Sequence, residues 1–261
     1  MKNKTHRSEK YLTIPENISG DDYYRFFKLN SIVQEIIKKN HSNKITIIDI
    51  GSGNGYLMKY IKDSSDKNIK FEFIGIDKYV TEKSFDFQLI NQDIEGGIHL
   101  PDQSADIIIG AEIIEHISNT DGFIEEIYRI LKKDGDVILS TPNLASYFNR
   151  FLLLFGYQPY HSEVSNKESG FGLGLVYKVL GRSRYGNKTA GHLRMFSLRA
   201  LRDFVEFYGF KIIKYYPVYF SSFREDNNRK VIIKTFFALD RVISSIFPSL
   251  ASGLIIHLKK K

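Results

Sequence analysis

Short apolar runs alternate along the chain with stretches of helical periodicity. The apolar runs, which we predict to be buried strands, are 45–50, 71–76, 86–90, 105–110, 136–140, 210–216 and 254–258. Helical periodicity covers 21–39, 56–62, 120–131 and 197–208, and Asp21 is a suitable N-cap for the first of these helices. Strands that alternate with helices in this way predict an open, largely parallel sheet with helices on both faces.

The alternation is interrupted between about residues 143 and 192. This stretch combines clustered Phe, Leu and Tyr residues with a glycine-dotted segment and a basic loop, and it is too apolar to be a linker. We interpret it as a helical cap insert that covers the sheet and grips the substrate. The 261 residues otherwise predict a single domain, 1–261, which begins with an N-terminal arm and helix at 1–40.

The segment from Val242 to Leu258 has 17 residues without Asp, Glu, Lys or Arg. A membrane-spanning helix needs about 20 apolar residues, and Pro248 and Gly253 interrupt this segment, so we predict a short helix, a turn and a final strand. The basic N-terminus lacks the apolar stretch of a signal peptide, which favours a cytoplasmic location. Because the sequence has no cysteine, disulfides, iron–sulfur clusters and thiol nucleophiles are excluded.

The sequence IIDIGSGNGYL, residues 47–57, places three glycines directly after the first predicted strand. Gly51, Gly53 and Gly55 allow positive φ and close approach of the backbone to a ligand. Dinucleotide-binding turns have the spacing G-x-G-x-x-G, with a pyrophosphate at the helix N-terminus. Here the third glycine comes one position early, before Tyr56. Asp49 at the end of the strand would also repel a pyrophosphate, so the turn favours a cationic ligand.

Two further acids follow the next two predicted strands. Asp77 ends the second strand, where its carboxylate can accept the hydroxyl protons of a ribose. Asp93 follows the third strand, where it can bind an adenine amino group. Any one of the acids could instead be a solvated loop residue. Because the carboxyl ends of strands in an open α/β sheet meet at one crevice, the acids and glycines together predict a nucleoside-binding site.

These motifs resemble those of class I S-adenosylmethionine-dependent methyltransferases, and within them the type that methylates quinones, sugars and other small metabolites. The glycine turn, Asp77 and the stretches PDQSADIIIGAEIIEHI (101–117) and EIYRILKKDGDVILSTPN (126–143) carry the resemblance, and the stretch 191–210 adds to it. The resemblance implies an α/β, Rossmann-like doubly wound sheet of seven strands, six parallel and one antiparallel. It also implies S-adenosyl-L-methionine as the cofactor.

The resemblance assigns roles to individual residues of the predicted site. The glycine turn would face the methionine part of the cofactor, Asp77 its ribose, and Asp93 with Ile94 its adenine. Glu112, just after the fourth predicted strand, would line the same pocket. The full set of predicted cofactor-binding residues is Asp49, Gly51, Ser52, Gly53, Gly55, Asp77, Lys78, Asp93, Ile94 and Glu112.

Methyl transfer to a hydroxyl needs in-line positioning of donor and acceptor and is helped by a general base. His116, in the sequence EIIEH, and His192, shortly before the helix predicted at 197–208, are the candidate catalytic bases. His116 could instead be a structural residue bonded to the backbone, and orientation alone could carry the reaction. The E-x-x-E-H pattern lacks the first histidine of an inverted zinc motif, so we predict no metal site.

The character of the acceptor is predicted from charge and apolarity. The net charge is +7, and residues 182–261 carry +11 against −4 for residues 1–181, which indicates an anionic partner. The insert contains the apolar residues Phe148, Phe151, Leu152, Leu153, Leu154, Phe155 and Tyr157, followed by the basic residues Arg182, Arg184, Lys188 and Arg194. This pairing predicts a small-molecule, saccharide or lipid-like acceptor with an anionic group, and peripheral membrane contact. Ordinary cap packing with surface arginines is the alternative.

Other functions are weighed against this interpretation. Methylation at cytosine carbon 5 needs a cysteine, and the D/N-P-P-Y/F motif of adenine-amine enzymes is replaced by Ala-Glu-Ile-Ile at 111–114, which argues against a nucleic-acid substrate. The position of Tyr56 argues against a nicotinamide-dependent oxidoreductase. A binding module that keeps the cofactor pocket without catalysis stays open. The sequence favours an S-adenosylmethionine-dependent methyltransferase that methylates oxygen.

Overall fold

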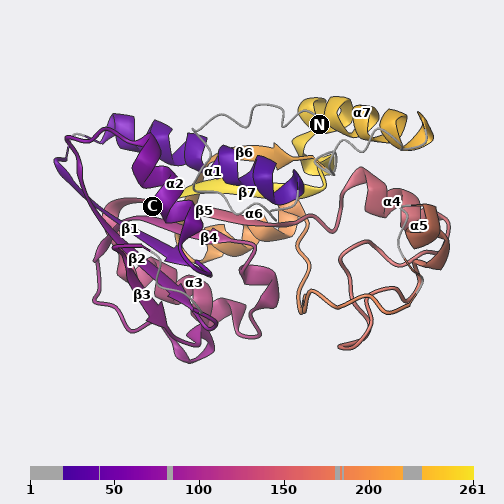
Figure 1. Cartoon of the computed structure of the whole chain (residues 1–261), viewed down its shortest axis with the longest axis horizontal. Helices are drawn as coiled ribbons and strands as arrows, with labels where there is room; N and C mark the ends of the chain where they lie inside the picture. The colour runs from indigo at the N-terminus through magenta and orange to yellow at the C-terminus, as the bar shows by residue number, and fades with distance from the viewer. Residues whose placement is uncertain (1–19, 41, 81–84, 180–182, 184, 220–230) are drawn as a thin grey trace, which may run out of the picture.

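The computed structural model describes residues 20–40, 42–80, 85–179, 183, 185–219 and 231–261, which are built around one sheet (Figure 1). The sheet has seven strands in the order β3-β2-β1-β4-β5-β7-β6. The strands are β1 (Lys44–Ile50), β2 (Lys70–Asp77), β3 (Gln88–Asn91), β4 (Ala105–Ala111), β5 (Leu131–Pro142), β6 (Phe210–Val218) and β7 (Gly253–Lys260). β7 lies antiparallel between β5 and β6, and the other six strands are parallel to one another. The predicted fold class is confirmed.

Helices connect the strands and form the insert. The α-helices are α1 (Gly20–Lys39), α2 (Tyr56–Ser64), α3 (Thr120–Ile130), α4 (Tyr147–Leu154), α5 (Gly174–Val179), α6 (Leu198–Phe207) and α7 (Val231–Ile246). Short 3₁₀ helices occur at η2 (Ile94–Gly96), η3 (Ile114–His116) and η5 (Pro248–Leu250). Among the described residues, no helix is long and apolar enough to cross a membrane.

The sheet is buried on both faces, as expected for parallel strands that are apolar throughout. Alternate isoleucines of β1 point to opposite sides, so Ile47 belongs to one apolar cluster and Ile48 to the other. On the first face, α1 and α2 contribute Leu29, Val33, Met58 and Ile61. On the second face, α3 and α6 contribute Ile124, Ile127, Leu201 and Val205. Figure 1 shows α1 and α2 on the side of the sheet opposite α3.

The insert has a small apolar core of its own and forms a separate lobe beside the sheet in Figure 1. The buried members of this core are Phe148, Leu152, Tyr160, Leu173 and Tyr177. Asn149 of α4 is 2% exposed, and its side chain donates to the Asn143 carbonyl and accepts from the Tyr160 amide at 2.7 Å. Asn143 in turn donates to the Ser249 and Ala251 carbonyls. Buried amide side chains therefore attach the insert to the end of β5.

Some predicted element boundaries differ from the structure. β3 starts two residues later than predicted, and β5 begins at Leu131 rather than at residue 136. Of the extra β5 residues, Leu131 pairs with Ala105 of β4, and the register shifts between Ala105 and Ile107, which an apolar-run pattern does not register. α7 begins well before the short helix that we expected near Val242. The predicted arm at residues 1–19 lies outside the described residues.

Gly75 lies in the centre of β2, where a Cβ atom would come within 2.6–2.7 Å of Leu89, Ser52 and Met58. We expect Gly75→Ala to lower the free energy of unfolding by about 1 kcal/mol, since the flexible ends of three neighbouring side chains would have to shift. Urea denaturation measures this change. Gly96→Ala is the matched control, because a Cβ atom there meets nothing within 4 Å. Equal stability of the two variants would contradict the described packing around β2.

Candidate active site

The turn after β1 is held in a conformation that favours glycine. Gly51, Gly53 and Gly55 have φ values of +79°, +53° and +83°, in the left-handed region where other residues are strained. Gly55 is the N-cap of α2, and the Gly51 amide donates to the Ile76 carbonyl at 2.8 Å. The turn therefore lies against the end of β2, and its glycines have the positive φ that the sequence predicted.

Asp77, the last residue of β2, holds this turn in place. One carboxylate oxygen accepts from the Gly53 amide at 2.8 Å, and the other accepts from the Tyr79 amide at 2.7 Å. A carboxylate fixed by two backbone donors has a defined orientation. Asp77 is thus both a structural anchor of the turn and a group available at the carboxyl edge of the sheet.

A cavity of about 370 Å³ lies beside this turn, within the range of about 300–1,000 Å³ that is usual for small-molecule sites. Its lining residues are Gly51, Ile76, Asp77, Lys78, Tyr79, Gln92, Asp93, Ile94, Glu95, Ile113, His116 and Ile117. Five of the predicted cofactor-binding residues and one predicted base are among them. The apolar members come from β2, η2 and the segment that follows β4, so they form one wall of a cavity with acids at its edge.

Asp93 and Lys78 form an ion pair at the mouth of the cavity. The Lys78 ammonium lies 2.6 Å from the Asp93 carboxylate, and both side chains are about half exposed. This contact lowers the pKa of Asp93 below its usual range. Asp93 also accepts from the Glu95 amide and so caps η2. Its carboxylate is held in place, and its exposed side remains open to a ligand.

The other predicted cofactor residues are not among those that line the cavity. Asp49 is 2% exposed inside β1, and Ser52 and Gly53 lie in the turn itself. Burial, together with the nearby Asp77 carboxylate, raises the pKa of Asp49 to about 7. A carboxyl group of this kind carries only part of its charge at neutral pH, and a cation nearby would favour its ionised form.

Glu112 follows β4 with a φ of +52°, which is uncommon for a residue other than glycine. Its carboxylate accepts from the Ser140 hydroxyl at 2.8 Å and pairs with Arg25 at 3.2 Å. Arg25 comes from α1, on the first face of the sheet, and the sequence analysis did not identify it. The sequence around a helical arginine does not show that its side chain contacts a residue that is distant in the sequence.

His116 and His192 come from distant segments but lie together. Their ring centroids are 4.9 Å apart. The Nδ1 atom of His116 lies 3.0 Å from the Gly191 carbonyl oxygen, and that of His192 lies 2.9 Å from the His161 carbonyl oxygen. Because a carbonyl can only accept, each Nδ1 donates, and each neutral ring keeps a lone pair on Nε2. His116 is therefore bonded to the backbone, as the structural alternative expected, and it also lines the cavity.

Glu163 fixes the segment that carries His192. Its carboxylate accepts from the amides of Ala190, Gly191 and His192 at 2.7–3.1 Å. The segment also docks on η3, because the Glu115 carbonyl accepts from the Leu193 and Arg194 amides. The sequence analysis did not identify Glu163, whose role depends on a loop almost thirty residues away.

Glu115 is a further residue without an assigned role in the sequence analysis. It is 0% exposed, and its carboxylate lies near its own backbone amide, the Thr141 hydroxyl and the Arg25 guanidinium. Burial and the neighbouring Glu112 carboxylate raise its pKa well above the usual range. The E-x-x-E-H pattern was the available signal, but residue identities alone do not show that this carboxylate points inward.

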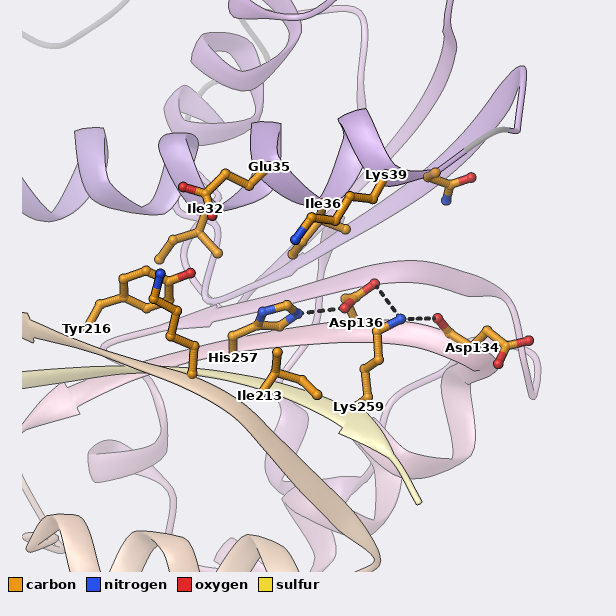
Figure 2. Close-up of a pocket in the computed structure, with 12 residues that line it drawn as sticks. Ile32, Glu35, Ile36, Lys39, Asp134, Asp136, Ile213, Tyr216, His257 and Lys259 are labelled. Carbon is orange, nitrogen blue, oxygen red and sulfur yellow. Dashed lines mark hydrogen bonds and ion pairs between the residues drawn. The ribbon is translucent and has the colours of Figure 1, made fainter.

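A second cavity, of about 410 Å³, lies at the opposite edge of the sheet, beneath α1 (Figure 2). Asp136 of β5 and His257 of β7 are both buried there and lie 2.6 Å apart. Lys259 pairs with the other Asp136 oxygen at 3.3 Å. Figure 2 shows these groups turned toward one another beneath Ile32 and Ile36. This cavity lies away from the glycine turn and contains none of the predicted site residues.

Comparison with known proteins identifies the family. A family model described as a methyltransferase domain matches residues 22–215, well over half of the chain. The chain belongs to the methyltransferase-domain family. This finding confirms the predicted family. The match includes β1 to β5, the insert, α6 and the glycine turn, so the methyltransferase domain includes every predicted site residue.

Two curated relatives resemble part of this methyltransferase domain. A Mycolicibacterium smegmatis protein named "Probable S-adenosylmethionine-dependent methyltransferase" is 26% identical over 140 residues, covering 52% of this chain and 51% of the relative. A ubiquinone biosynthesis O-methyltransferase from Pelagibacter ubique is 29% identical over 140 residues, covering 47% of this chain and 54% of the relative. The chain spans about half the length of the curated relatives it matches.

Solved structures share the fold of the methyltransferase domain. A SAM-dependent methyltransferase from Archaeoglobus fulgidus matches with a TM-score of 0.50 and 15% identity, covering 91% of this chain and 100% of that chain. The YcgJ protein from Bacillus subtilis matches with a TM-score of 0.51 and 16% identity, covering 91% of this chain and 99% of that chain. At these identities the likeness concerns the fold alone.

The raised pKa of Asp49 predicts a pH dependence of stability. The folded-state pKa of about 7 exceeds the usual 3.8, so the unfolded state ionises first and stability falls as pH rises from about 4 to 7. Asp49→Asn removes this decline, and at pH 8 we expect it to be more stable than the wild type by roughly 2–4 kcal/mol. Urea denaturation at pH 5 and pH 8 measures the difference. Exposed Asp86→Asn is the control, and a parallel pH response of Asp49→Asn and wild type would contradict the burial argument.

Proposed function

We propose that the protein transfers a methyl group from S-adenosyl-L-methionine to a hydroxyl oxygen of a small, largely apolar acceptor. The observation that carries this proposal is the cavity at the carboxyl edge of the sheet. There the glycine turn, Asp77 and Asp93 converge, and His116 lies in the same wall. Membership of the methyltransferase-domain family supports the same reaction.

The cavity offers a suitable group for each part of this cofactor. On this proposal, the Asp77 carboxylate accepts from the ribose hydroxyls, and Ile94, Ile113 and Ile117, which line the cavity, contact the adenine. Asp49 lies behind the glycine turn, where its partial negative charge favours the cationic methionine end of the cofactor. The name of the Mycolicibacterium relative agrees with this choice of cofactor.

S-adenosylmethionine supplies a methyl group on a positively charged sulfur, and the chain binds and orients the reactants. Orientation of two reactants can contribute about 7–11 kcal/mol to lowering a barrier. The Nδ1 contacts of His116 and His192 leave an unprotonated Nε2 atom on each neutral ring, and His116 lines the cavity while the His192 ring lies against it. On this proposal, one of these Nε2 atoms takes up the proton of an acceptor hydroxyl. We assign them to the acceptor side of the site.

The insert supports an apolar acceptor with an anionic group. Phe151, Leu153, Leu154 and Phe155 of α4 and the following turn are 55–78% exposed, a density of exposed apolar groups that is typical of binding surfaces. Arg150, Lys178 and Lys188 are exposed on the same lobe. Arg182 and Arg184 lie outside the described residues. The ubiquinone biosynthesis O-methyltransferases among the relatives also favour a lipid-like acceptor and methylation of oxygen.

Asp77→Ala tests the cofactor site. We expect S-adenosylmethionine to bind about 1–3 kcal/mol more weakly, since the variant loses charge-assisted hydrogen bonds to the ribose and the anchor of the Gly53 amide. Titration calorimetry measures the affinity, and circular dichroism shows that the fold is kept. Glu125→Ala, an exposed substitution on α3, should bind as the wild type does. Unchanged affinity in a folded Asp77→Ala variant would place the cofactor elsewhere.

His192→Ala tests the acceptor side. We expect turnover to fall by a factor of about 10² or more while cofactor affinity stays unchanged, because the imidazole acts on the acceptor alone. The assay follows a labelled methyl group from S-adenosylmethionine into a lipid and metabolite extract. His99→Ala, at an exposed position, should keep full activity. Absence of any labelled product with wild-type protein and extract would support the binding-module alternative over the enzyme.

A further inference from the structure

The second cavity, beneath α1, is lined by two buried polar groups that no described residue binds. His257 of β7 and Tyr216 of β6 are 9% and 6% exposed, and both line this cavity of about 410 Å³. Among the described residues, no hydrogen bond reaches the Nδ1 atom of His257 or the Tyr216 hydroxyl. Buried side-chain polar groups usually have a partner, so both atoms are available to a ligand.

Asp136 holds the His257 ring in one orientation. One carboxylate oxygen of Asp136 lies 2.6 Å from the Nε2 atom of His257, and the other lies 3.3 Å from the Lys259 ammonium. Because a carboxylate can only accept, Nε2 donates to it, which leaves Nδ1 for a ligand. A carboxylate beside an imidazole favours the protonated ring, in which Nδ1 carries a hydrogen. His257 is therefore oriented to donate to an acceptor in the cavity.

Lysine ammonium groups border the same space. The Lys214 ammonium lies 5.0 Å from the centre of the Tyr216 ring, and the Lys28 ammonium of α1 lies 4.8 Å from it. Lys39, in the last turn of α1, also lines the cavity. In the part of the chain that the structure describes, no acidic partner is recorded for Lys214 or Lys39. Their positive charge is therefore available to an anion.

Acidic residues also line the cavity, and their positions decide the sign of the charge near His257. Asp136 is already paired. Asp134 is exposed at the rim, where Figure 2 shows its carboxylate turned away from His257. Burial and the exposed Glu35 carboxylate of α1 raise the pKa of Tyr216, so the tyrosine hydroxyl keeps its proton and can donate. Glu35 thus lies near the tyrosine that two lysines contact, and the groups that remain around His257 are donors and cations.

Apolar side chains form another part of the wall. Ile32 and Ile36 of α1 and Ile213 of β6 line the cavity, and Figure 2 shows the two α1 isoleucines above His257. Small-molecule sites typically combine apolar walls with a few polar groups that fix the orientation of the ligand. The basic excess of residues 182–261 includes Lys214 and Lys259 at this cavity, so the insert does not account for all of it.

We propose that this second cavity binds a small organic acid as its carboxylate anion. The carboxylate accepts from the protonated His257 ring, with the Tyr216 hydroxyl and the Lys214 ammonium as further donors, and the apolar part of the acid packs against the isoleucines. When the ring is neutral before binding, it takes up one proton from solvent as the anion binds. The site lies away from the glycine turn and needs no S-adenosylmethionine, so the proposal is independent of the proposed function.

Benzoate is the probe, and benzamide, which has the same ring without the charge, is its matched control. Calorimetric titration of the whole chain should show saturable, millimolar binding of benzoate and binding of benzamide that is weaker by about tenfold or more. Imidazoles titrate between about pH 5 and pH 8, whereas benzoate stays ionised at pH 6 and above. We therefore expect benzoate to bind about fivefold or more tightly at pH 6 than at pH 8. Proton uptake should make the measured heat differ between Bis-Tris and Tris buffers. Absence of benzoate binding, or equal binding of benzamide, would overturn the proposal.

Variants show where benzoate binds. We expect His257→Leu to weaken binding by about tenfold or more, since a charge-assisted hydrogen bond is lost, and Lys214→Gln to weaken it by about two- to fivefold, as for a partly exposed ion pair. Lys214 is exposed, so its variant keeps the test valid if His257→Leu fails to fold. Lys67→Gln, at another exposed lysine, and His192→Ala should bind benzoate as the wild type does.

Two results with these variants would overturn the proposal. Benzoate affinity that is unchanged in Lys214→Gln would show that the second cavity does not bind the anion. Binding that His192→Ala loses and Lys214→Gln keeps would place the anion at the acceptor side of the candidate active site instead. Neither result depends on methyl transfer, so the proposed function is tested separately.

Discussion

Four carboxyl groups lie at the carboxyl edge of the sheet, where burial and mutual repulsion disfavour the ionised form of two of them. Asp49, Asp77, Glu112 and Glu115 follow or belong to neighbouring strands, and two of them have a pKa raised by burial and by another carboxylate. Among the described residues, the ion pair recorded for these four acids is that of Glu112 with Arg25. The fold thus creates a deficit of positive charge, which a cationic ligand can fill and an anionic one would worsen.

Much of the architecture and half of the site could be predicted from the sequence, because these features depend on local patterns. The uniformly apolar β1 has to be buried on both faces, and the glycines after it need a left-handed backbone. Strands that run parallel bring their ends to one edge, so acids such as Asp77 and Asp93 could be placed together without knowing any contact. The antiparallel direction of the last strand came from the family resemblance, and its position between β5 and β6 was not predicted, since apolar runs do not encode strand order.

The remaining features depend on contacts between distant segments. Arg25 meets Glu112 because α1 crosses the sheet, and Glu163 meets the loop at 190–192 because the insert folds back. Glu115 looks in the sequence like any acid in a short polar turn, and its burial follows from the docking of residues 193 and 194 on its backbone. The beginning of β5 was missed because Lys132, Lys133 and Asp134 interrupt the apolar pattern although they extend the strand.

The two ends of the insert lie next to each other, since Asn143 and Phe196 form an isolated parallel bridge. The insert therefore leaves and re-enters the sheet at one point, and it has its own apolar core and its own buried amide contacts. Such a segment can be lengthened, shortened or exchanged without altering the register of any strand. On the proposed assignment of the lobe to the acceptor, selection on acceptor preference would act on the lobe, while the glycine turn and the order of the sheet stay constant. Exchange of this lobe between family members would be a direct route to engineered acceptor specificity.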